Sequence, residues 1–520
     1  MSKKSSHIRV LTFAIYLCQI LWGSPLQQAL QPAADQPGDP LAVYKTGDYD
    51  RAIPLLQKAV TSNPKDPAMQ AALLSALVYR GQVDDASDAA AFDLQNFRQS
   101  ADVLAARGDF AFYMGDMTTA ENLYRASLRI SDKTARALYG LHRIHRAASM
   151  YRSARLLCIA AHQFDPDDAL ITLAFIGYVV PERRKEMLPD FAKSHPWFFN
   201  GPLGSAEQLG QTESELHQQL NARQPFEPDG PLRETVVPLH FLHNGTAVYG
   251  VGIDISINGS KPLRVLLDTG ASGLLLTQSA IDKAGLTHVG SFHVGGLGDK
   301  GPRGAFLSVA DTCSIANLKF KTCVFAGTEG KGKIAGDQDG LLGPDLFSDY
   351  LITIDFQKVS LHLVPLPERK PDAQGYNREP LAGEAGFTPV FRFGHHLYVS
   401  TKVNGKAIGL FLIDTGSSMS AIDATFARLT TKIYHNEYFE HVTGVSGKVN
   451  EVFQADKAEL QFSRFRQSNL GLTSINLNSS SGHQAVRMDG ILGFPILKFF
   501  RLTLDYRNGL VNFDYTLDRR

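Results

Sequence analysis

The segment Leu412–Ser418 reads LIDTGSS, and the earlier segment Leu266–Ser272 reads LLDTGAS. Each copy places Asp-Thr-Gly after an apolar run and before small residues. At average residue usage, a single Asp-Thr-Gly is expected by chance in roughly one chain in ten of this length. Two copies in the same local context therefore indicate a repeated structural unit.

The sequence around the two tripeptides is itself duplicated. Residues 251–270, VGIDISINGSKPLRVLLDTG, align with residues 397–416, LYVSTKVNGKAIGLFLIDTG, and both contain Asn-Gly ahead of the Asp. Downstream, DGLLGPDLF from Asp339 aligns with DGILGFPIL from Asp489, and each copy then ends in a strand-like pair of segments. Short Val/Ile/Leu-rich runs broken by Gly and Asn-Gly are typical of antiparallel β-structure.

Two series of small residues recur every 34 positions in the first third of the chain. The turn series is Gly47, Gly81, Gly115 and Ser149, and the helix series is Ala52, Ala86, Ala120 and Ala154. This pattern resembles the tetratricopeptide repeat, in which a small Ala lets paired helices approach closely and Gly relieves the turn between them. The resemblance implies a surface for a protein partner or for self-association, and a structural spacer is the alternative.

The extreme N-terminus has the pattern of a bacterial-type export signal. Lys3, Lys4 and Arg9 precede the apolar stretch Val10–Trp22, whose thirteen residues are too few to span a bilayer. We therefore expect a signal peptide over residues 1–30, no stable membrane span, and a periplasmic or secreted protein. An uncleaved N-terminal anchor is the alternative.

Composition narrows the possible functions. The 520 residues carry 52 basic and 52 acidic side chains, so the net charge is zero and nothing favours a nucleic-acid partner. A chain of this length is expected to form several domains. The cysteines are too few for a disulfide scaffold, but Cys313 and Cys323 flank a predicted hairpin turn at Asn317 and could pair in an oxidising compartment.

The duplicated half resembles the aspartic proteases. A strand ending in Asp-Thr-Gly, a Gly-rich hairpin, and then Asp-Gly-hydrophobic-Leu-Gly is the pattern of that family. The short units are most similar to the retropepsin-like branch, here fused in tandem as in pepsin-like enzymes. The resemblance covers about residues 235–517 and implies an aspartic endopeptidase acting on polypeptides without a cofactor or metal.

The resemblance and the residue chemistry together assign the site. Asp268 and Asp414 are the predicted catalytic pair, because two close carboxylates share one proton, as in known aspartic protease dyads. The charged member would take a proton from a water, and the protonated member would donate to the scissile carbonyl oxygen. Such a pair titrates as a unit, so neither Asp is assigned one role.

Residues next to the two Asp side chains are expected to support them. The resemblance implies that the hydroxyls of Thr269 and Thr415 interlock, and Gly270 and Gly416 permit the tight turns. Ser417 stands where the first copy has Ala271, and a hydroxyl hydrogen bond to Asp414 would favour its charged form. On this basis we expect an activity optimum less acidic than in an enzyme with hydroxyls at both positions.

The Gly-rich hairpins VGGLGDKG and VTGVSGKV are flap candidates. Gly295, Gly296 and Gly444 are the residues expected to close over an extended peptide. A rival hypothesis is a non-catalytic exported scaffold whose protease-like lobes bind peptides. Pairing of like lobes between chains, driven by the repeats, is another alternative.

The predicted architecture is an all-α solenoid followed by an all-β bilobal aspartic protease. Its boundaries are a signal peptide (1–30), tetratricopeptide repeats (35–180), a linker (181–234) with a helical stretch near residues 213–222, lobe 1 (235–366), an interlobe linker (367–384) and lobe 2 (385–520).

Overall fold

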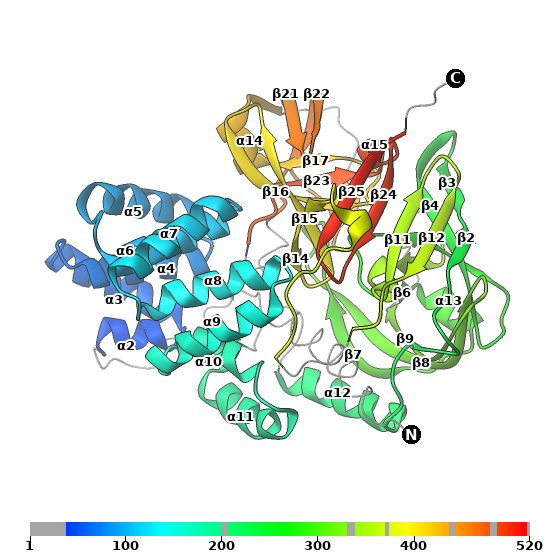
Figure 1. The fold of residues 1–520 in the computed structure, drawn as a ribbon, viewed down its shortest axis with the longest axis horizontal. Coiled ribbons are helices and arrows are strands. Elements are labelled where there is room, and N and C mark those ends of the chain that lie inside the picture. The colour runs from blue at the N-terminus through cyan, green and yellow to red at the C-terminus, as the bar shows by residue number, and fades with distance from the viewer. Residues whose placement is uncertain are drawn as a thin grey trace.

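A computed structural model describes residues 38–198, 206–329, 338–369, 374–435, 442–478 and 486–516. Helices occupy the N-terminal part and strands the remainder, which confirms the expected order of α then β (Figure 1). The predicted signal peptide lies outside these residues. Across the part of the chain that is described, no helix has the length and apolar character needed to cross a membrane.

The N-terminal helices form consecutive pairs. The pairs are α2 (Pro40–Lys45) with α3 (Tyr49–Ser62), α4 (Pro67–Tyr79) with α5 (Val83–Asn96), α6 (Ala101–Tyr113) with α7 (Met117–Ile130), α8 (Ala135–Ala147) with α9 (Tyr151–Phe164), and α10 (Ala169–Ile176) with α11 (Pro181–Ser194). We call α2–α11 the helical array.

The turn within each of the first four pairs has the same backbone conformation. Gly47, Gly81 and Gly115 have φ values of 79°, 67° and 78°, and Ser149 follows them with φ 59°. Glycine adopts this left-handed region without steric cost, so the small-residue series marks the turns. The alanines of the second series are at most 1% exposed, because they lie where the paired helices meet.

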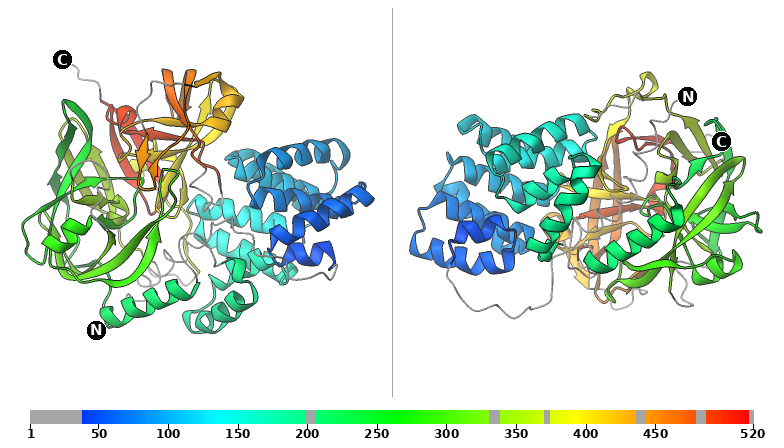
Figure 2. Two further views of the ribbon diagram at one scale, coloured as in Figure 1. Left: turned by 180° about the vertical axis from the view of Figure 1, so that it is seen from behind. Right: turned by 90° about the horizontal axis from the view of Figure 1, so that it is seen from below.

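The expected linker at residues 181–234 contains two helices, of which α12 (Ala206–Leu220) overlaps the helical stretch expected near residues 213–222 and α11 was not expected. Helix α11 continues the array, and α12 packs on the β-rich part through Leu216 and Leu220. Pro181 occupies the first turn of α11. The N–H groups of a first turn have no acceptor within the helix, so a proline there costs no hydrogen bond. A Pro-rich composition therefore did not prevent helix formation. Figure 2 shows α12 alongside the first β unit.

The strands after residue 239 form two units with the same pairing order. The first unit comprises β3 (His240–Asn244), β4 (Ala247–Ile257), β5 (Leu263–Leu267), β6 (Leu274–Leu276), α13 (Gln278–Lys283), β7 (Val289–Val294), β8 (Arg303–Ile315), β9 (Leu318–Thr328) and β10 (Gly340–Leu342); β1 (Glu227–Pro228) adds to β9. The second comprises β14 (Phe391–Phe393), β15 (His396–Val403), β16 (Ala407–Asp414), β17 (Ala421–Asp423), α14 (Ala424–Thr430), β18 (Ile433–His435), β21 (Val452–Phe462), β22 (Phe465–Ile475) and β23 (Gly490–Gly493).

Strand pairing closes each unit on itself. In the first unit the order β4-β5-β10-β6-β9-β8 returns to β4. In the second unit β15-β16-β23-β17-β22-β21 returns to β15 in the same way. Closure leaves few unpaired strand edges. The duplication seen in the sequence therefore extends to topology.

A six-stranded sheet joins the two units. Its order is β13 (Thr388–Pro389), β25 (Leu510–Tyr515), β24 (Phe500–Asp505), β11 (Tyr350–Asp355), β12 (Ser360–Pro365) and β2 (Thr235–Pro238). Each unit contributes three strands, and they meet at the antiparallel pair β11–β24, where the Thr353 and Thr503 hydroxyls are 3.1 Å apart. One continuous core runs through both units and this sheet.

The helical array packs against the second unit. Phe112 of α6 and Leu141 of α8 share a core with Tyr398 and Leu410 of the second unit, and the Phe112 ring meets Phe393 edge-on at 6.1 Å. The views in Figures 1 and 2 agree that α8 and α9 face the second unit.

Candidate active site

Asp268 and Asp414 stand at the ends of equivalent strands. Asp268 follows β5, Asp414 ends β16, and each of these strands pairs in parallel with the strand of the downstream motif, β10 or β23. The Asp268 N–H donates to the Leu342 carbonyl at 2.9 Å. The LLG and ILG segments therefore flank the strands that deliver the two Asp side chains.

Four hydrogen bonds interlock the two Asp-Thr-Gly loops. The Thr269 hydroxyl donates to the Ile413 carbonyl at 2.6 Å, and the Thr415 hydroxyl donates to the Leu267 carbonyl at 2.8 Å. Each hydroxyl also accepts the backbone N–H of the other Thr, at 2.9 and 3.1 Å. Both Thr side chains are fully buried. The interlock forms within one chain and fixes the loops against each other.

Gly270 and Gly416 are required by close approach across this interlock. A Cβ atom at Gly416 would lie 2.2 Å from Cγ of Asp268, and one at Gly270 would lie 2.9 Å from Cγ of Asp414. Neither glycine lies in the left-handed region. The expectation that they serve a tight turn is therefore refined, because each glycine makes room for the opposite carboxyl.

The two carboxyls form a hydrogen-bonded pair. Burial raises the pKa of Asp268 well above its ordinary range, and the neighbouring Asp414 raises it further. Burial also raises the pKa of Asp414, against the hydrogen bonds it receives from Asp268 and from the Ser417 and Gly416 N–H groups. A pair in this environment keeps one shared proton at a pH where isolated carboxyls are charged.

Ser417 does not act on Asp414 as the sequence analysis expected. Its backbone N–H donates to Asp414 Oδ1 at 2.9 Å, but its hydroxyl donates to the Met419 carbonyl at 2.8 Å. An alanine could make the same N–H contact. The Ser/Ala difference therefore does not supply the expected hydroxyl bond, and the argument for a less acidic optimum loses its basis.

The two Gly-rich hairpins meet each other. Gly296 N–H donates to Ser446 Oγ at 3.1 Å, Ser446 N–H to the Leu297 carbonyl at 3.0 Å, and Lys300 N–H to the Ser446 carbonyl at 2.9 Å. Gly444 leaves no room for a Cβ, which would lie 2.3 Å from the Leu297 carbonyl oxygen, and Gly295 is exposed beside them.

The tip of the second hairpin reaches the first unit. Val445 packs against the buried cluster of Leu242, Leu266 and Leu341, and so does Ala271, which follows the first Asp-Thr-Gly. The hairpin contacts therefore extend to the loop that carries Asp268.

Cys313 and Cys323 are joined by a disulfide within the β8–β9 hairpin. The hairpin turn lies at Ala316 and Asn317, and Cys313 pairs in register with Phe320. Thr322 has φ 55°, which turns the chain just before Cys323. Both cysteines lie in the core of the first unit. They are on β8 and β9, which are not the strands that lead to the two Asp residues.

Two histidines that the sequence analysis did not select contact the Asp268 loop. His395 and His396 place Nε2 at 3.3 and 3.0 Å from the Gly270 carbonyl oxygen. Their aligned positions in the first copy are Tyr249 and Gly250. A comparison of the two copies for chemical asymmetry, beyond the residues adjoining each Asp, could have identified them.

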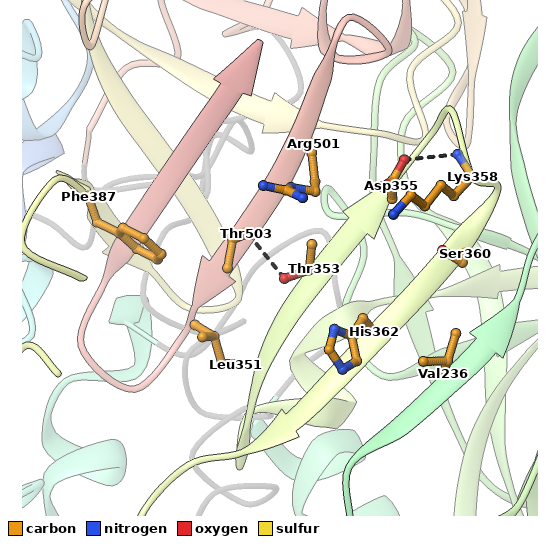
Figure 3. A pocket seen from close by; sticks show the side chains of 10 residues that line it. All are labelled: Val236, Leu351, Thr353, Asp355, Lys358, Ser360, His362, Phe387, Arg501 and Thr503. Carbon is orange, nitrogen blue, oxygen red and sulfur yellow. Dashed lines mark hydrogen bonds between the residues drawn. The ribbon is translucent and has the colours of Figure 1, made fainter. Parts of the chain in front are cut away.

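A cavity of about 420 Å³ lies on the six-stranded sheet, away from the Asp-Thr-Gly loops (Figure 3). Strands β2, β11, β12 and β24 line it with Val236, Leu351, Thr353, Asp355, Lys358, Ser360, His362, Arg501 and Thr503, and Phe387 closes one side. Several of its charged side chains have partners outside the cavity lining, since Arg501 pairs with Asp514 and His362 with Glu234. We assign this cavity no function.

Metal ligation has no basis in the described side chains, among which no group of three His, Cys, Asp or Glu could hold an ion.

Comparison with known families matches residues 253–346 to the aspartyl protease family. The matched segment contains Asp268 and the DGLLG motif, so the comparison supports an aspartyl protease domain in the first unit. Asp414 lies outside the match, and its relation to Asp268 rests on the duplication and on the interlock described above. No curated protein matches the chain.

Proposed function

We propose that this protein is an aspartic endopeptidase whose two β units are the lobes of one enzyme. The observation that carries the proposal is the four-bond interlock of Thr269 and Thr415, which brings Asp268 and Asp414 into contact within one chain. The aspartyl protease match in the first unit supports the same chemistry.

The proposed reaction uses a water held between the two carboxyls. The charged carboxylate accepts a proton from the water as it attacks the scissile carbonyl carbon, and the protonated carboxyl donates to the carbonyl oxygen. Collapse of the tetrahedral species then breaks the C–N bond: the amine leaves with the proton that the first carboxyl took from the water, and one hydroxyl returns its proton to the second carboxyl as the carbonyl re-forms. The raised pKa of both Asp residues supports a pair that carries one proton over a wide pH range. The two paired hairpins would open to admit an extended peptide and close over it.

We further propose that the helical array is a set of tetratricopeptide repeats that recruits a protein partner or mediates self-association. Within the array, Arg136 pairs with Asp168 and Arg143 pairs with Asp109, and these side chains are largely buried. Exposed apolar side chains would contribute to binding, among them Leu156, which is 55% exposed. Sedimentation of the purified protein over a concentration series tests self-association.

Export through a signal peptide at residues 1–30 is part of the same proposal. N-terminal sequencing of the protein recovered from periplasm and medium tests it, because an uncleaved anchor would leave residue 1 in place.

The mechanism is tested by single Asp268→Asn and Asp414→Asn variants assayed on casein, with and without pepstatin. Both variants should lose cleavage, and pepstatin should inhibit the unmodified protein. Asp311→Asn is the matched control, because the Asp311 side chain is 85% exposed, and it should cleave normally. Cleavage that survives both active-site substitutions would rule out the mechanism. Peptide binding by an unmodified protein that never cleaves would instead favour the scaffold.

A further inference from the structure

The β14–β15 hairpin carries two imidazoles to the loop of Asp268. Gly394 and His395 form its turn, and His396 begins β15. The two rings lie against each other, with centroids 3.9 Å apart, and both Nε2 atoms approach the Gly270 carbonyl oxygen. The hairpin is held in place from the helical array by the edge-on contact of Phe393 with Phe112.

The contact determines which ring atom carries a proton. A carbonyl oxygen can only accept, so a histidine nitrogen at 3.0 Å from it must be an N–H donor. One carbonyl has two lone pairs and can accept from both rings. Burial lowers the pKa of His395 to about 4 and that of His396 well below its usual value, so both rings are neutral at mildly acidic pH.

The Gly270 carbonyl and the Ala271 N–H belong to the same peptide group. The Ala271 N–H donates to the Asp268 main-chain carbonyl at 3.1 Å, and the Gly270 N–H donates to Asp268 Oδ1 at 2.8 Å, so this turn holds the Asp268 carboxyl from its own backbone. A peptide whose oxygen accepts a hydrogen bond becomes a stronger donor through its N–H, because hydrogen bonds in a chain polarise one another.

The second loop has no equivalent donor at the matching position. Gly250 takes the place of His396 in the first copy, and a Cβ there would lie 3.8 Å from the Thr415 carbonyl oxygen. The Asp414 loop instead receives N–H bonds from Gly416 and Ser417, both at 2.9 Å. The two carboxyls therefore sit in chemically different surroundings.

We propose that His396, supported by His395, is a positioning residue for Asp268: it donates to the Gly270 carbonyl and so fixes the turn from Asp268 to Ala271, in which the Gly270 N–H donates to the Asp268 carboxyl. This inference rests on the proposed protease function and adds to it the origin of an asymmetry between the two Asp residues. Replacing the donor should weaken stabilisation of the charged pair.

The charged and titratable groups that face these rings are few. Arg392 lies on the same hairpin and also lowers the pKa of His395, although burial lowers it more. His396 faces His395 and the Asp345 carboxylate, which accepts from Ser272 and from the Gly273 N–H. None of these is altered by a substitution at His396 itself, so a change in the pH profile reports on the donated hydrogen bond.

The test compares His396→Phe, which removes the donor, with His396→Gln, whose amide can donate from a similar position. The pH dependence of kcat/KM and of pepstatin affinity measured by calorimetry are the two readouts. For His396→Phe, both acid limbs should move up by roughly 0.5 to 1 pH unit, because the charged pair has lost support. His396→Gln should return the acid limb to the pH found for the unmodified protein. His362→Gln on the six-stranded sheet should leave the pH profile unchanged.

An acid limb unmoved in an active His396→Phe variant would overturn the proposal, as would an equal shift in the Phe and Gln variants. If His396→Phe does not fold, His395→Phe replaces it and should shift the limb in the same direction by a smaller amount; no shift there overturns the proposal. Asp268→Asn in the same series separates the two hypotheses. Activity in that variant would refute the protease mechanism, whereas its inactivity beside an unshifted His396→Phe would refute only the role of the histidine.

Discussion

The two glycines of the Asp-Thr-Gly loops set the distance between the carboxyls at the scale of single residues. Each faces the side chain of the opposite Asp, and Gly416 is the tighter of the two. The limiting factor is space, since neither residue needs a left-handed backbone. A methyl group at either position has to push the carboxyl or the loop away.

We therefore expect Gly416→Ala to lower kcat/KM by about 100-fold or more, because a shift of the order of 1 Å in a reacting group has that effect. Gly270→Ala should lower kcat/KM less, because a Cβ there would lie 2.9 Å from Cγ of the opposite Asp, against 2.2 Å at Gly416. Gly386→Ala is the control, since a Cβ there meets nothing within 4 Å and its φ is not in the left-handed region. Peptidase assays combined with Tm measurements check the three variants, and equal activity of Gly416→Ala and Gly386→Ala would contradict the steric argument.

Asp489 shows how the helical array changes the chemistry of a duplicated residue. Its counterpart Asp339 also accepts a backbone N–H from the neighbouring strand, but it pairs with Lys283 and retains 22% exposure. Asp489 is fully buried, and the turn at Gly115 covers it. Burial raises the pKa of Asp489 to about 8, although Arg487 partly opposes the shift.

The raised pKa predicts a stability that falls with pH. The folded state keeps a proton that the unfolded chain releases near pH 4, so stability is greatest below that value and declines as pH rises toward 8. Asp489→Asn should remove this decline. Its Tm should match that of the unmodified protein near pH 4 and exceed it at pH 8, by an amount corresponding to about 2–5 kcal/mol. Asp339→Asn serves as the matched variant, and the same pH-dependent gain in both would contradict burial as the cause.

At the scale of elements, the two Gly-rich hairpins form a ladder of hydrogen bonds between the units. The segments 296–300 and 444–450 exchange main-chain bonds, and Asp299 adds a side-chain bond to the Asn450 N–H at 2.7 Å. Glycine lets the two backbones approach, since a Cβ at Gly298 would lie 2.4 Å from the Gly447 carbonyl oxygen.

Gly298→Ala should separate the hairpins and weaken substrate capture. We expect KM to rise about tenfold with a smaller change in kcat, as when one or two hydrogen bonds are lost. Gly301→Ala is the matched control, because Gly301 also has a left-handed backbone but a Cβ there meets nothing within 4 Å. Steady-state kinetics on a peptide substrate distinguish them, and similar KM values for the two variants would assign the effect to backbone strain alone.

The whole molecule is held together by a core shared between the helical array and the second unit. Phe112, Leu141 and Ile144 of the array contribute to it, together with Leu410 and Leu412 of the strand that ends in Asp414. The Arg487 N–H donates to the Tyr113 carbonyl at 2.9 Å at the same interface. The array therefore supports one of the two Asp-bearing strands directly.

A shared core predicts cooperative unfolding. Phe112→Ala should destabilise the full chain by about 3–5 kcal/mol and lower its Tm without splitting the transition, because Phe112 is 1% exposed and contacts both parts. Ile130→Ala on α7 is the control, since its side chain is 51% exposed and should change Tm little. Differential scanning calorimetry of both variants provides the measurement. Two separate transitions, only one of which shifts, would show that the array unfolds independently.

Sequence patterns predicted the parts that depend on neighbours along the chain. The 34-residue series located the turns of the helical array, and the aligned copies indicated two equivalent β units. Cys313 and Cys323 were paired because they flank one hairpin, and they form a disulfide. The Pro-rich composition after residue 180 predicts a linker, whereas the structure has α11 there, with Pro181 in its first turn and Pro189 inside it. The Ser417 hydroxyl was assigned to Asp414, but it bonds to the nearer Met419 carbonyl.

The sequence by itself determined the order of helices and strands, the duplication, and that each β unit carries a single Asp-Thr-Gly. These follow from periodicity and composition over short stretches, which constrain local backbone conformation. Only the tertiary structure decided the contact between Asp268 and Asp414, the meeting of the two hairpins, and the approach of His396 to Gly270. Each of these brings together segments more than one hundred residues apart, and their separation depends on how the six-stranded sheet and the shared core pack. The segment LIDTGSS contains one of the two Asp residues of the site, and tertiary packing brings the loop of the other one to it.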